Sequence, residues 1–167
     1  QASGVSARFS IAGAETIAAA ARHRATVRGE DAVARLIDVE TAVEVLGGKI
    51  EFESGEEGRE DQILQHLLRT SIAQAARAHF GGVDFAPLVE AFDGSRTITT
   101  GQHVTAAEFL AELPEPTELE IYDELASRLD ADSTPGLRAG AIELALEGLY
   151  LAQELSKESA DGQTVYG

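Results

Sequence analysis

The sequence contains no cysteine, methionine or tryptophan, and only 13 lysine and arginine residues against 29 aspartate and glutamate residues. Without cysteine the chain forms neither disulfide bonds nor thiolate metal sites, which is consistent with a reducing cytoplasm. The net charge of −16 argues against nonspecific binding to nucleic acid or to an anionic membrane, because both need surface cations. No apolar run approaches the roughly 20 residues that cross a bilayer, and there is no signal-peptide pattern. We therefore expect a cytoplasmic protein without nucleic-acid or membrane partners.

The chain does not begin with methionine. We therefore infer that it is a fragment of a longer protein, and that its function depends partly on the segments outside it. The 167 residues suit one ordinary domain or a small subdomain packed on a larger one. Apolar residues make up 44% of the chain, which is enough for a hydrophobic core, so wholesale disorder is not expected.

Apolar periodicity predicts a mostly α-helical fold. The expected helices are Phe9–Val27, Ala32–Leu46, Arg59–Phe80, Asp84–Phe92, Thr105–Leu113, Thr117–Leu129 and Thr134–Leu155. In the last helix, small and apolar residues recur from Leu137 to Leu155 at spacings of four and three, a pattern typical of a seam for another helix. Ala141 and Gly148 in this seam would let the partner helix approach closely.

Two short stretches have the character of strands. Lys49–Glu53 alternates polar and apolar residues, and Arg96–Thr100 is rich in β-forming residues, so the two are candidates for a two-stranded element. We expect one helical piece over residues 1–46, a helical extension over 47–160 and a tail over 161–167. The tail, with the two residues before it, is expected to be frayed.

No catalytic motif is complete in this chain. The phosphate-binding Gly-x-x-x-x-Gly-Lys-Ser/Thr loop, the Gly-x-Ser-x-Gly elbow and the His-Glu-x-x-His motif are all absent. The histidines lack metal-binding spacing and are expected to be unrelated polar residues: His23, His66, His79 and His103. Paired carboxylates are expected to be solvated surface, although a divalent-cation site or a metal-dependent enzyme remains an alternative. These pairs are Glu51 and Glu53, Glu56 and Glu57, Glu60 and Asp61, Glu118 and Glu120, and Asp123 and Glu124.

Arg8 is the candidate functional residue, because the segment Gly4–Arg8 leads directly into the first predicted helix. A helix N-terminus carries unpaired N–H groups and a partial positive charge, so it favours an anion. An arginine there adds five fixed donors that match phosphate oxygens. Arg8 is therefore suited to contacting a phosphate that is held elsewhere. The alternative is a surface arginine without such a role, which the helix dipole mildly disfavours.

The segment Gly4–Arg8 resembles the entry to the lid helix of AAA+ ATPases of the MoxR and magnesium-chelatase groups. Phe9–Arg28 is similar to the alanine-rich lid helix of those proteins, and Lys49–Glu53, Arg59–Leu64 and the helical tail are similar to their C-terminal part. The resemblance implies that residues 1–46 are a lid-like subdomain, that 47–160 are a C-terminal extension, and that Arg8 is the "sensor 2" arginine.

The same resemblance implies a division of labour within a longer protein. ATP and Mg²⁺ would bind an upstream core domain, where Arg8 contacts the γ-phosphate and couples hydrolysis to lid movement. The extension would contact neighbouring subunits of a ring or a partner protein. This chain alone is then expected to be inactive and to bind no cofactor.

The alternative is a stand-alone acidic helical domain that binds other proteins and has no nucleotide role. The seam in the last helix and the acidic surface favour it. Arg22, Arg24 and Arg28 suit either a neighbouring subunit or the negative end of the helix dipole.

Overall fold

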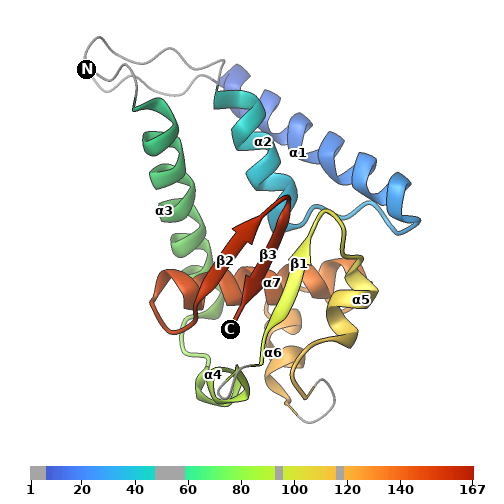
Figure 1. The fold of residues 1–167 in the computed structure, drawn as a ribbon, viewed down its shortest axis with the longest axis vertical. Helices are drawn as coiled ribbons and strands as arrows, with labels where there is room; N and C mark the ends of the chain where they lie inside the picture. Colours follow the sequence, from blue (N-terminus) through green and yellow to red (C-terminus); the bar gives the residue numbers. More distant parts are fainter. Residues whose placement is uncertain (1–6, 48–58, 93–95, 116–118) are drawn as a thin grey trace.

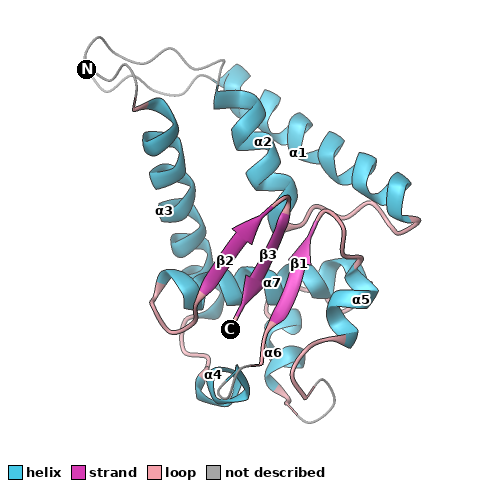
Figure 2. Ribbon diagram, viewed as in Figure 1, coloured by secondary structure: helices cyan, strands magenta, loops and turns pink. Residues whose placement is uncertain are grey.

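The computed structural model describes residues 7–47, 59–92, 96–115 and 119–167. Within these ranges the predicted mostly α-helical fold with a small β element is confirmed (Figures 1 and 2). The elements are α1 Ala7–Arg28, α2 Leu36–Gly47, α3 Glu60–Phe80, α4 Ala86–Phe92, β1 Ile98–Gly101, α5 Ala106–Ala111, α6 Ile121–Ser127, α7 Pro135–Leu151, β2 Lys157–Ala160 and β3 Gln163–Tyr166.

Helix α7 is the centre of the body, a name we give to the elements from α3 to β3. It starts as predicted, because the side chain of Thr134 accepts a hydrogen bond from the N–H of Leu137 and Pro135 occupies the first turn. Helices α3, α5 and α6 pack on α7, and the three-stranded sheet lies in front of it in Figure 1. Ile142 and Leu146 are fully buried as a result, which is typical of a helix that is apolar on most of its sides.

The predicted close helix approach on α7 is confirmed at Gly148. A Cβ atom added there would lie 2.8 Å from the Cβ of Ala76 on α3, so the two helices are too close for a larger residue. Leu137, the first residue of the predicted seam, is instead exposed. The seam therefore begins further along the helix than the spacing suggested.

The sheet differs from the prediction. Strand β1 does contain most of the predicted Arg96–Thr100 segment, but it pairs with β3, in the order β1-β3-β2, all antiparallel. Its suggested partner, Lys49–Glu53, lies outside the described residues. The prediction of a frayed tail is wrong, because β2 and β3 form a hairpin at the C-terminus. Asp161 and Gly162, both with positive φ, make its turn, as an Asp-Gly pair favours.

Helices α1 and α2 pack against each other beside this body. The N-terminal ends of α1 and α3 and the C-terminal end of α2 lie near one end of the molecule, and α4 lies at the other (Figure 1). Helix α2 begins at Leu36 rather than at Ala32, because the N–H of Arg35 donates to the carboxylate of Asp38 at 2.8 Å and closes the first turn there. The proposed boundary between residues 46 and 47 stays a prediction.

Candidate functional site

Arg8 is the second residue of α1, so the prediction that it lies just inside a helix start is confirmed. Its side chain lies outside the described part of the structure. The residues that follow it show how open this end of the helix is: Ser10 is exposed, and the side chain of Ile11 is 59% exposed. The start of α1 is thus uncovered on the faces that carry these two residues.

The other end of α1 is anchored by Arg24. Its guanidinium is buried and donates to the carboxylate of Asp38 at 2.9 and 3.2 Å, to the carbonyl of Val33 at 2.7 Å and to Glu30. Burial alone would lower the pKa of Arg24, but the hydrogen bond and charge of Asp38, with the charge of Glu30, outweigh it and raise the pKa. Arg24 therefore holds the turn between α1 and α2, a role that its place near a helix end did not indicate.

Arg35 lies between α1 and α2 and reaches into the body. Its guanidinium donates to both carboxylate oxygens of Glu143 on α7, at 2.5 to 3.2 Å, and the two side chains are 0% and 1% exposed. It also donates to the hydroxyl of Thr100 on β1 at 2.9 Å and to the carbonyl of Val104 at 2.8 Å. The Thr100 hydroxyl in turn donates to Glu143. One guanidinium thus joins three separate parts of the body, using the planar fork that distinguishes arginine from lysine.

A second ion pair, between the buried Glu147 and the partly buried Lys157, lies one turn further along α7. Glu147 accepts from the ammonium of Lys157 on β2 at 2.8 Å and from the hydroxyl of Tyr166 on β3 at 2.6 Å. Lys157 also donates to Glu40 on α2 at 3.2 Å, and so links α2 to the sheet. Burial alone would lower the pKa of Lys157, but the hydrogen bonds and charges of Glu147 and Glu40 outweigh it and raise the pKa. Burial, followed by the charge and hydrogen bond of Glu147, raises the pKa of Tyr166.

These contacts form a charged interface between the α1–α2 pair and the body. Among the described residues, every buried side-chain nitrogen or oxygen has a hydrogen-bond partner, so the network is complete. Sequence reasoning missed it, because Arg35 and Glu143 are 108 positions apart. The available sign was two glutamates, Glu143 and Glu147, four positions apart in an otherwise apolar stretch of helix.

The other candidate groups do not converge. The side chains of the four histidines are exposed, and His103 contacts Arg28 at 2.5 Å. Within the described ranges no three metal-ligating side chains gather. The carboxylates of the predicted surface pairs that the structure describes are exposed: Asp61, Glu120, Asp123 and Glu124. The remaining members of those pairs, Glu51, Glu53, Glu56, Glu57, the side chain of Glu60, and Glu118, lie outside the described part.

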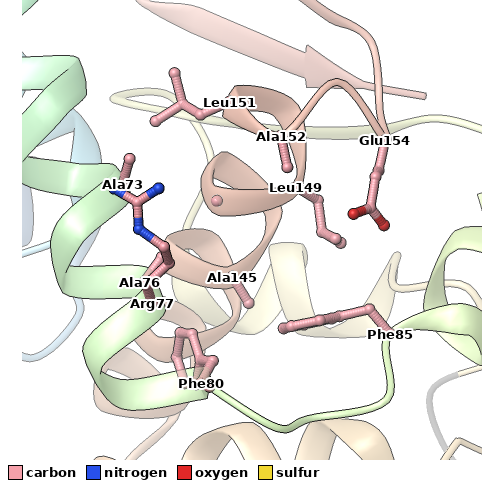
Figure 3. Close-up of a pocket in the computed structure, with 12 residues that line it drawn as sticks. Ala73, Ala76, Arg77, Phe80, Phe85, Ala145, Leu149, Leu151, Ala152 and Glu154 are labelled. Carbon is pink, nitrogen blue, oxygen red and sulfur yellow. The ribbon is translucent and has the colours of Figure 1, made fainter.

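An apolar groove of about 210 Å³ opens between α3 and α7 (Figure 3). Phe80, Phe85 and Leu149 contribute to its lining, and the exposed side chains of Arg77 and Glu154 lie on opposite sides of it. Its volume is below the roughly 300 Å³ at which small-molecule pockets begin, so it suits one large apolar side chain better than a cofactor.

No described helix is long and apolar enough to span a membrane. No protein-family model, curated protein or solved structure matches the chain.

Proposed function

We propose that this chain is the C-terminal region of a cytoplasmic, magnesium-chelatase-like AAA+ ATPase, and that its lid senses bound ATP through Arg8. ATP and Mg²⁺ bind an upstream core domain in this proposal, and the chain itself is not catalytic. The observation that carries it is the position of Arg8 in the first turn of a 22-residue helix, close to the exposed residues Ser10 and Ile11.

The geometry of α1 supports this role. At 1.5 Å per residue the helix is about 33 Å long, so a small rotation at its base moves Arg8 by several ångströms. The base is fixed, because Arg24 is buried between Glu30 and Asp38. The start of the helix favours an anion, and an arginine there can bind two phosphate oxygens at once. A helix that is anchored near its C-terminal end and carries an arginine in its first turn suits a group that follows a bound nucleotide.

The test is Arg8→Ala in the intact ATPase. ATP turnover is expected to fall by about 10³-fold, as for other arginines that stabilise phosphoryl transfer, while the Kd for ATP changes little. Arg22→Ala is the matched control, because Arg22 is an exposed arginine on the same helix. Unchanged turnover in Arg8→Ala would remove Arg8 from the mechanism and overturn the proposal.

The groove between α3 and α7 favours a second candidate, a protein-interaction domain without a nucleotide role. Its size suits one anchoring side chain, the usual centre of a protein interface. The coding sequence immediately upstream separates the two candidates. A phosphate-binding loop followed by an acidic strand end supports the ATPase, and their absence supports the interaction domain.

A further inference from the structure

The apolar core of the described structure stops at the body. Its main cluster of buried apolar residues lies between Ala76 and Tyr166, whereas α1 and α2 contribute only small buried apolar residues outside that cluster: Ala21, Ala25 and Ala42. Helix α1 packs mainly on α2, with polar contacts to the body near its C-terminal end, where Arg28 donates to the carbonyl of Gln102. Helix α2 also packs on α3, and the side-chain hydrogen bonds that tie the α1–α2 pair to α7 and the sheet are charged: the buried contact of Arg35 with Glu143 and the partly exposed contact of Lys157 with Glu40.

Apolar and charged contacts constrain a helix differently. Apolar contact is roughly proportional to buried area and has no preferred direction. A buried guanidinium with four acceptors allows one orientation, because any rotation leaves a charge or a hydrogen-bonding group without a partner. Replacing a buried ion pair by apolar residues often preserves stability, so net stabilisation is a weak explanation for the presence of such a pair.

We propose that Arg35 and Glu143, together with Lys157, Glu147 and Glu40, form an orienting joint that sets the direction of α1–α2 relative to α7. Arg35 is its central positioning residue, since its guanidinium bonds α7, β1 and the loop before α5 at once. The joint thereby fixes where the start of α1 lies. The effect of the joint on helix orientation is independent of the proposed function, whereas its effect on ATP sensing rests on that function.

The experiment measures a distance between two spin labels. The chain has no cysteine, so Ser10→Cys on α1 and Ser127→Cys on α6, both exposed positions, give a unique labelled pair. In this background Arg35→Met/Glu143→Leu removes both charges and leaves neither ion unpaired. The width of the distance distribution is expected to increase about twofold, because several orientations become accessible.

Two controls isolate the joint. Arg96→Met/Glu115→Leu removes an exposed ion pair of the body and is expected to leave the distribution unchanged. Arg35→Lys keeps the positive charge but loses the fork, and is expected to widen the distribution while the chain stays folded by circular dichroism. If the first double variant does not fold, Arg35→Lys alone decides the question. A distribution as narrow as that of the parent protein in every folded Arg35 variant overturns the joint.

The outcomes separate this inference from the proposed function. The distance is measured without nucleotide, so an unchanged width overturns the joint whatever Arg8 does. A widened distribution together with unchanged turnover in Arg8→Ala keeps the joint and overturns the proposed sensing of ATP through Arg8. If both hold, Arg35→Lys in the intact ATPase lowers turnover about tenfold or more while the Kd for ATP stays within about twofold.

Discussion

The body and the α1–α2 pair are joined by contacts of a different kind from those that hold the body together. Around α7 the contacts are apolar, as at the buried side chains of Leu146 and Phe109. At α2 they are charged, as at Arg35 and Lys157. Apolar burial supplies most of the free energy of folding, and many sequences achieve it. Charged contacts contribute little net stability but demand one geometry, so few residues decide where α1 points.

The largest expected effect comes from breaking the charged interface on one side only. Arg35→Met leaves the carboxylate of Glu143 buried without its partner, and should lower the free energy of unfolding by about 3–5 kcal/mol. The double variant Arg35→Met/Glu143→Leu should recover most of that loss. Urea unfolding followed by circular dichroism measures both.

The matched control is Arg96→Met, in an ion pair whose side chains are 54% and 41% exposed. It should change stability by less than about 1 kcal/mol, since exposed pairs contribute little. A double variant as unstable as Arg35→Met alone would show that the charges do more than set orientation. The charged interface would then stabilise the fold as the apolar contacts of the body do, and the two kinds of contact would not differ in function.

A smaller effect tests the packing of the body. Gly148→Ala places a methyl group 2.8 Å from the Cβ of Ala76, so α3 and α7 must separate, at a cost of about 1–3 kcal/mol. Gly140→Ala in the same helix meets only the carbonyl of Ala34 at 3.6 Å, an ordinary contact. It should stabilise the protein by about 0.5–1 kcal/mol, because alanine loses less backbone entropy than glycine. Thermal unfolding of the two variants should therefore shift in opposite directions, and shifts of the same sign would contradict the close packing.

Local features of the body could be predicted from the sequence. The capping box at Thr105 and Glu108 and the cap at Thr134 are present, because each depends on residues three positions apart. The position of Arg8 in the first turn of α1 likewise depends on residues close to it in sequence. The hairpin turn at Asp161 and Gly162 was also readable, but its shortness and its place at the chain end made a frayed tail the expectation.

The charged interface could not be predicted in the same way. Arg24 was interpreted from its place near a helix end, whereas its partners Glu30 and Asp38 become neighbours only when α2 folds back. The pairing of Arg35 with Glu143 spans most of the chain, and no spacing rule connects such residues. The pairing of β1 with β3 is non-local for the same reason. The residues that set the direction of α1 are therefore those that local patterns do not reveal.

The smallest effect concerns Tyr166, where the body meets the charged interface. Its folded pKa is raised above the ordinary value of 10.0, first by burial and then by the charge of Glu147. The stabilisation is therefore complete below about pH 10 and is lost as the pH rises above it, because the unfolded chain then releases the proton first. Tyr166→Phe loses the hydrogen bond to Glu147, about 1 kcal/mol near neutral pH, but lacks this alkaline loss.

The stability curves of Tyr166→Phe and the parent protein should therefore converge above pH 10, by up to about 1.4 kcal/mol per pH unit. Burial also raises the pKa of Tyr122, which donates to the carbonyl of Pro114, but that residue is present in both proteins and cancels in the comparison. Lys157 is likewise present in both. Urea midpoints between pH 8 and pH 11 provide the measurement, since convergence requires a proton that the folded protein holds at the interface. Parallel curves would mean that Tyr166 ionises equally in the folded and the unfolded protein. The hydrogen bond to Glu147 would then not stabilise the neutral hydroxyl.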